Sequence, residues 1–151
     1  MKLEDAIKQK TPFKSIWQKV MVNILYTHNW LTDMHKDIFK PYGITPQQYN
    51  VLRILRGQHP NPVSTCTIRE RMLDRMSDVS RIVDRLVKKK LVVRQICMTD
   101  KRLVDVVISE SGLALLADVD AKSDEMDHSL ANLTETEAQQ LSDLLDKLRK
   151  D

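Results

Sequence analysis

The chain has 151 residues, of which 42% are hydrophobic and 30% are charged, so it can bury the core of one domain. Only three glycines and five prolines are present, which favours a mostly helical protein. No run approaches the roughly 18 apolar residues of a membrane helix, and the charged N-terminus has no apolar segment typical of a signal peptide. We therefore expect a cytoplasmic protein. The two cysteines are too few for a disulfide framework.

The net charge of +3 is distributed unevenly along the chain. Lysine plus arginine and aspartate plus glutamate number 7 and 4 in residues 1–52, 13 and 5 in residues 53–102, and 4 and 12 in residues 103–151. The three segments therefore carry +3, +8 and −8. A basic middle segment is typical of a module that binds phosphate groups, although an ordinary solvated surface could also be basic.

Three helices are expected in the first half of the chain. Apolar residues at three- and four-residue steps predict the first helix from about Phe13 to Phe39. Thr45 and Gln48 predict a capping box at the start of the second helix, which should end near Gly57. Ser64 should begin a short third helix. Its inward-facing residues are expected to be Ile68, Met72 and Leu73.

A fourth helix with Ser77 as its cap follows a short break. Its apolar residues recur with the spacing of one helical face. They are Val79, Ile82, Val83, Leu86 and Val87. The opposite face is polar and mostly basic, and Asp84 on that face is expected to orient its basic neighbours. Two short helices with a tight break between them, the second one amphipathic, predict a helix-turn-helix.

The apolar period then changes from 3.6 to 2, which indicates strands. Leu91–Cys97 and Leu103–Ser109 are predicted to pair as a hairpin with the charged loop Met98–Arg102. A fifth helix should start at Ser109 or Ser111 and run to about Leu130. The sixth helix should begin with a second capping box, formed by Thr134 and Glu137.

A helix-turn-helix followed directly by a hairpin is a winged helix, and it predicts binding to double-stranded DNA. A helix about 10 Å wide fits the major groove, which is about 12 Å wide, and Arg81 can address guanine with two hydrogen bonds. Lys101 and Arg102 in the hairpin loop are expected at the neighbouring minor groove. Asp100 is expected to pair with Arg102 or another basic side chain and fix its direction. The candidate DNA-binding residues are Ser64, Thr65, Arg75, Ser77, Asp78, Ser80, Arg81, Arg85, Lys88, Asp100, Lys101 and Arg102.

Five motifs resemble the MarR family of winged helix-turn-helix regulators, and the resemblance runs from about residue 15 to 150. Met76–Leu86 looks like the family's recognition helix, and Leu91–Arg94 is similar to the strand that follows it. Asp100–Arg102 resembles the D-x-R of the wing tip. Ser109–Gly112 resembles the T-x-x-G after the wing, and Leu133–Glu137 resembles the start of the last helix. One departure is Lys90, where the family usually has glycine.

The resemblance implies one MarR-type domain with residues 46–109 as the DNA-binding module and residues 13–40 and 110–150 as dimerisation helices. It implies a homodimer on a pseudo-palindromic operator, often a repressor that a small aromatic or phenolic ligand releases. The surplus apolar surface of the terminal helices also favours a dimer. The candidate dimerisation residues are Trp17, Ile24, Leu141, Leu144, Leu145 and Leu148, and the candidate ligand contacts are His28, Trp30 and His35.

Two other interpretations stay open. A winged helix can bind a protein partner without DNA, and Cys66 and Cys97 could form part of a redox-sensing regulator, although most cysteines are simply small buried residues. An enzyme is not expected, because no glycine-rich phosphate loop, nucleophile motif or cluster with metal-ligand spacing is present, and no cofactor is expected.

Overall fold

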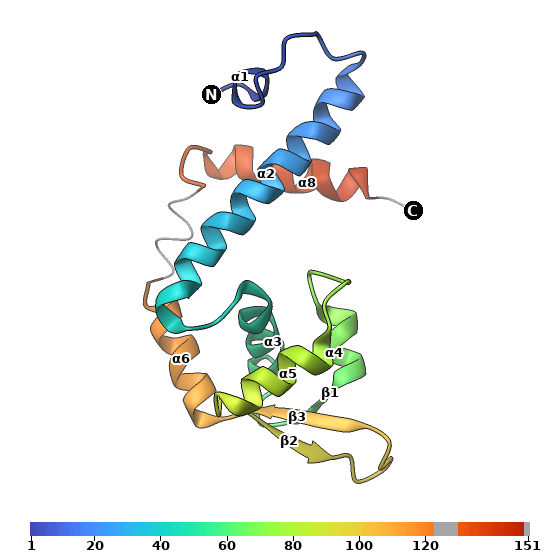
Figure 1. Ribbon diagram of the computed structural model, residues 1–151, viewed down its shortest axis with the longest axis vertical. Helices are drawn as coiled ribbons and strands as arrows, with labels where there is room; N and C mark the ends of the chain where they lie inside the picture. The colour runs from blue at the N-terminus through green and yellow to red at the C-terminus, as the bar shows by residue number, and fades with distance from the viewer. Residues whose placement is uncertain (123–129, 150–151) are drawn as a thin grey trace. The chain divides into compact units, whose positions relative to one another are not determined.

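The computed structural model describes residues 1–122 and 130–149. The chain divides into two compact units, residues 1–50 and residues 51–151, and the boundary falls inside helix α3 (Pro46–Arg56). Most of the described residues are helical, and the strands among them form one small antiparallel sheet (Figure 1). This arrangement confirms the predicted fold class, which is mainly α with a small β-hairpin wing.

The first unit is built on the long helix α2 (Ile16–Phe39), which Ser15 caps by accepting a hydrogen bond from the Gln18 N–H. The sequence did not predict the short helix α1 (Leu3–Ala6) that precedes it. Lys19 of α2 forms an ion pair with Glu4 of α1, and the hydrogen bond from Lys19 holds the pKa of Glu4 below its usual value.

The 3-10 turn η1 (Lys40–Tyr42) ends α2 and leads into α3. The predicted capping box begins α3, because the Thr45 hydroxyl accepts from the Gln48 N–H at 3.1 Å and the Gln48 side chain accepts from the Thr45 N–H at 3.2 Å. Paired capping bonds of this kind satisfy two backbone donors at the helix start.

The second unit places two helices and a sheet next to one another in the chain order that a winged helix requires (Figure 1). The elements that follow α3 are β1 (Val63–Ser64), α4 (Thr65–Arg71), α5 (Val79–Lys88), β2 (Val92–Ile96), β3 (Val104–Ile108), α6 (Glu110–Asp120) and α8 (Glu135–Leu148). The predicted hairpin is present, with Val92 opposite Ile108 and Ile96 opposite Val104. The two-residue strand β1, which was not predicted, pairs with the other edge of β3.

The core of the second unit lies between α4, α5 and the sheet. The inner face of α5 is buried, as predicted, at Val79, Val83 and Leu86. Gly112 at the start of α6 belongs to a close approach of two backbones, because a Cβ at this position would lie 2.3 Å from the Leu91 carbonyl oxygen. Only glycine fits there without a shift of the chain.

Two local predictions around the helix-turn-helix are wrong. The cap of α5 is Asp78 and not Ser77, since the Asp78 carboxylate accepts from the Arg81 N–H at 3.1 Å. Leu73 does not face the core, because α4 ends at Arg71 and Leu73 lies in the following turn with its side chain exposed. Ile68 and Met72 are buried as predicted.

The last two helices match the predictions at their starts. Ser109 caps α6, but this helix ends at Asp120, well before the predicted end near Leu130. Residues 123–129 of that prediction lie outside the described residues. Thr134 and Glu137 form the predicted capping box of α8, and the hydrogen bonds from Thr134 hold the pKa of Glu137 below its usual value.

Candidate nucleic-acid interface

The outer face of α5 is an exposed, mostly basic surface. Arg81, Arg85 and Lys88 follow one another at steps of four and three residues, so their side chains project along one line of the helix. All three are exposed. An exposed row of cations on one helix can lie against phosphate groups or the electronegative atoms of guanine.

The start of α5 is fixed by Asp78. The carboxylate that the sequence suggested for DNA contact accepts the Arg81 N–H, and it thereby sets the first turn from which Ser80 and Arg81 project. The hydroxyl of Ser77 is buried and has no hydrogen-bond partner among the described residues. In this conformation Ser77 therefore offers no hydroxyl to a ligand at the surface.

The loop between β2 and β3 carries Lys101 and Arg102, which are both exposed. Asp100 orders this loop in a different way from the predicted ion pair, because its carboxylate accepts from the backbone N–H of Arg102 at 2.9 Å. The Leu103 N–H also donates to the Asp100 carbonyl oxygen at 2.9 Å. Asp100 therefore directs Arg102 through the backbone rather than through its guanidinium group.

Asp84 joins the helix to the sheet. Its carboxylate forms an ion pair with Arg94 of β2, a residue that the sequence did not single out. The partner of Asp84 is thus a strand residue and not one of its helical neighbours. The contact links the outer face of α5 to strand β2 of the wing.

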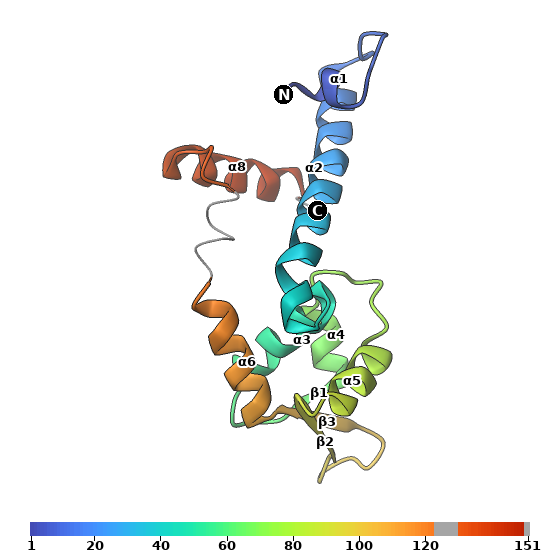
Figure 2. The same cartoon turned by 60° about the vertical axis from the view of Figure 1, so that its left-hand side comes forward.

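The cations of the second unit differ in their pairing. Arg56 and Arg94 each have a carboxylate partner, Asp120 and Asp84 respectively. No ion pair within the described part of the chain involves the exposed cations of α5, of the wing loop or of the turn before α5, which are Arg75, Arg81, Arg85, Lys88, Lys101 and Arg102. Figures 1 and 2 both show the wing loop on the side of the second unit where α5 begins. The arrangement is a positive surface without internal counterions.

The remaining candidate contacts lie at the start of α4. The Ser64 hydroxyl accepts from the Thr67 N–H at 3.1 Å and caps this helix. Ser64 and Thr65 are both half-buried, so they are less exposed than the polar and basic residues on the outer face of α5.

The two cysteines are free and lie in separate elements. Cys66 on α4 is exposed, whereas Cys97 is half-buried with its sulfur 3.1 Å from the Thr99 hydroxyl. This contact places a sulfur near the wing loop, but neither thiol has a partner cysteine in this structure.

The terminal helices expose most of their apolar residues. Trp17 of α2 is 78% exposed, and Leu144 and Leu148 of α8 are 62% and 60% exposed. Leu141 is also exposed, and only Ile24 and Leu145 among the candidate dimerisation residues are half-buried. No residue of α8 is buried at all. Such faces are rarely left in water by a soluble protein.

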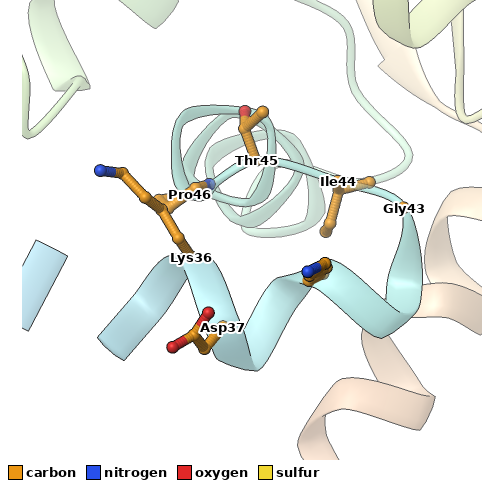
Figure 3. Close-up of a pocket in the computed structure, with 7 residues that line it drawn as sticks. Lys36, Asp37, Gly43, Ile44, Thr45 and Pro46 are labelled. Carbon is orange, nitrogen blue, oxygen red and sulfur yellow. The ribbon is translucent and has the colours of Figure 1, made fainter. Parts of the chain in front are cut away.

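The candidate ligand contacts do not form one site on α2. His28 and His35 are two turns apart and share a face, whereas Trp30 projects to the opposite side of the same helix. A hollow of about 360 Å³ lies instead at the end of α2 and the start of α3. Lys36, Lys40, Ile44 and Pro46 contribute to its lining. In Figure 3 the Asp37 carboxylate points away from the Ile44 side chain.

Residues 1–122 and 130–149 contain neither a membrane-spanning helix nor a metal-ligating cluster. No helix in these ranges is long and apolar enough to cross a membrane. No group of three or more histidine, cysteine, aspartate or glutamate side chains in these ranges could hold a metal ion.

Comparison with known proteins identifies relatives over most of the chain. The model of the MarR family matches residues 42–103. The HTH-type transcriptional regulator MhqR of Bacillus subtilis is 28% identical over 116 residues, covering 76% of this chain and 78% of MhqR. A MarR transcription factor from Planctomyces limnophilus is 29% identical with a TM-score of 0.70, covering 89% of this chain and 98% of its own.

Two more distant structures share the fold. The MarR C80S mutant of Escherichia coli, solved with operator DNA, is 23% identical with a TM-score of 0.76, covering 99% of this chain and 100% of its own. BpsR of Bordetella bronchiseptica, whose DNA binding is regulated by 6-hydroxynicotinic acid, is 22% identical with a TM-score of 0.69, covering 85% of this chain and 99% of its own. The winged helix, the match of residues 42–103 to the family model and the similarity to MhqR and to the Planctomyces limnophilus structure all point to MarR-family transcriptional regulators as the proteins that this chain resembles.

Proposed function

We propose that the chain is a homodimeric repressor that binds a pseudo-palindromic DNA operator. In this proposal α5 lies in the major groove and the β2–β3 loop lies at the neighbouring minor groove. The observation that carries the proposal is the set of exposed cations on α5 and the wing loop that have no carboxylate partner among the described residues. DNA phosphates and guanine edges supply the missing acceptors.

Arg81 is the proposed base-reading residue. It projects from the first turn of α5, where the Asp78 cap fixes the helix start, and it is exposed. The planar guanidinium matches guanine O6 and N7, and each such bidentate contact contributes about 1–3 kcal/mol to discrimination against the wrong base. Arg85, Lys88 and Arg102 are proposed as phosphate-region contacts, which add affinity with little sequence preference.

The dimer is proposed to form through the terminal helices. The exposed residues Trp17, Leu144 and Leu148 belong to apolar faces that need a partner surface. A twofold dimer would bury these faces and place two copies of α5 about 34–36 Å apart, one turn of DNA. The acidic segment 103–151 suits a part of the protein that stays away from phosphate.

Release of the operator by a small aromatic ligand completes the proposal. The regulation of BpsR by 6-hydroxynicotinic acid makes an aromatic acid a reasonable effector class, and His28 and His35 remain candidate contacts because they share one face of α2. The hollow beside Lys36 and Lys40 offers cationic and apolar groups to such a ligand. We expect at least one aromatic acid to lower the affinity of the protein for its operator. If no member of a panel of aromatic acids changed that affinity, only the proposal of ligand release would be contradicted.

Selection of bound duplexes from a random DNA pool tests the proposed function. We expect an enriched pseudo-palindrome whose half-sites are about 10 base pairs apart, and binding that weakens steeply with salt. A winged helix that acts only on a protein partner would enrich no sequence and would show no salt-dependent affinity for duplex DNA. The proposal assigns the chain no enzymatic reaction and no cofactor.

A further inference from the structure

The turn between α4 and α5 holds two large apolar side chains in water. Leu73 is 90% exposed and Met76 is 92% exposed, which is more than the exposed leucines of α8. Isolated apolar residues at a surface are common, but two such exposed side chains three residues apart in one turn are a candidate contact surface.

The turn itself is held by its own hydrogen bonds. The Met76 N–H donates to the Asp74 carboxylate at 2.9 Å, and the Ser77 N–H donates to the Asp74 carbonyl oxygen at 3.2 Å. Met76 is also two residues before the Asp78 cap of α5. These bonds order the backbone from Asp74 to Ser77, directly before the first turn of α5 from which Arg81 projects.

The charges around the pair favour DNA as its partner. Arg75 lies between Leu73 and Met76, Arg71 ends α4, and both arginines are exposed. An apolar protein surface that covered the pair would also have to cover these cations, which costs free energy unless acids are supplied. DNA supplies phosphates for the arginines and one apolar group in the major groove, the 5-methyl group of thymine.

We propose that Leu73 and Met76 contact thymine 5-methyl groups in the major groove and thereby extend the sequence read by the protein beyond the guanine contact of Arg81. The inference rests on the proposed function, because it requires α5 to enter that groove. Its chemistry is separate, since a methyl contact is apolar and independent of salt, whereas Arg81 acts through hydrogen bonds and charge.

Replacement of thymine by uracil in the selected operator tests the inference, because uracil lacks only the methyl group. Each thymine is replaced singly and the affinity is measured. Burial of one methyl group predicts about a fourfold loss of wild-type affinity at one or two positions of each half-site. Leu73→Ala or Met76→Ala should weaken binding to the thymine operator by a similar factor. Each variant should then bind the thymine and uracil operators with equal affinity.

Met98→Ala is the matched control. Met98 is 97% exposed and lies in the wing loop, which the proposed function places at the minor groove, where thymine shows no methyl group. This variant should keep the full preference for thymine over uracil. All three side chains are in water, so none of the variants should lower the thermal midpoint of the free protein.

Four results would overturn the inference. Equal wild-type affinity for thymine and uracil at every position would overturn the inference and leave the proposed function intact. An unchanged preference for thymine in the Leu73 and Met76 variants would have the same consequence. A change in the sedimentation of the free protein by either variant would assign the pair to contacts between copies of the chain. If the wild-type protein bound no duplex specifically, the proposed function and this inference would both fail.

Discussion

Lys90 occupies a backbone conformation that suits glycine. Its φ of 61° lies in the left-handed region, directly after the end of α5. The conformation closes the helix, because the Lys90 N–H donates to the Val87 carbonyl at 2.9 Å and the Leu91 N–H donates to the Leu86 carbonyl at 3.0 Å. The Lys90 carbonyl also accepts from the Ser109 hydroxyl at 2.7 Å. Glycine would keep every one of these bonds.

The substitution Lys90→Gly should therefore stabilise the protein. Relief of the left-handed conformation contributes about 1–2 kcal/mol. The greater freedom of glycine in the unfolded chain offsets about 0.4–1 kcal/mol of this gain. Because Lys90 is exposed, loss of its side chain removes little packing. The expected net gain is about 0.8 kcal/mol, the midpoint of the difference between these two ranges, which corresponds to about 2–3 °C in the thermal midpoint for a chain of this length.

Urea unfolding followed by circular dichroism at one fixed protein concentration measures this effect. Lys89→Gly is the matched control, because it removes the same charge from a residue with φ of −80° and ψ of −2°, where no strain is relieved. The control should lose about 0.5–1 kcal/mol. A Lys90→Gly protein that is no more stable than wild type would refute the assignment of strain to this residue.

Three further predictions concern the wing, the dimer and the last helix. Arg102→Ala should weaken operator binding and reduce the slope of log affinity against log salt by about one unit. Asp100→Ala should also weaken binding, although it removes a negative charge, because the Asp100 carboxylate holds the Arg102 N–H. Tighter operator binding by the Asp100 variant in a titration would refute this role. Leu144→Asp combined with Leu148→Asp should give a monomeric or unfolded protein without operator affinity, and an unchanged dimer in sedimentation would contradict the proposed interface. Because the folded pKa of Glu137 is lowered from 4.5, the contribution of this carboxylate to stability is present above pH 4.5 and is lost as pH falls through the folded pKa. Glu137→Gln should reduce this acid dependence of the unfolding free energy. An unchanged dependence on pH in the variant would contradict the role of Glu137.

Elements with local signals could be predicted from the sequence. The capping boxes of Thr45 and Thr134 mark true helix starts, because all the groups that form them lie within three residues of one another. The apolar face of α5 and the alternation in β3 were also visible, since each periodicity reflects a single buried face. The position of the exposed polar face of α5 could be inferred from its apolar face, because the two lie on opposite sides of the helix.

Features that depend on distant contacts could not be predicted in the same way. Strand β1 has only two residues and exists because it pairs with β3, and α1 is a short helix that contacts α2 through the Lys19–Glu4 ion pair. The Asp84–Arg94 ion pair likewise joins separate elements. At the start of α5, Ser77 and Asp78 are both good caps, so the choice between them depended on the preceding turn, whose course also exposes Leu73 and Met76.

The most direct test of DNA reading by α5 is the affinity of Arg81→Ala for the selected operator and for a duplex of scrambled sequence. We predict a loss of about 1–3 kcal/mol on the operator and a much smaller loss on the scrambled duplex, because Arg81 is proposed to read a base as well as to carry charge. An equal loss on both duplexes would show that Arg81 contributes charge alone and would contradict the central claim.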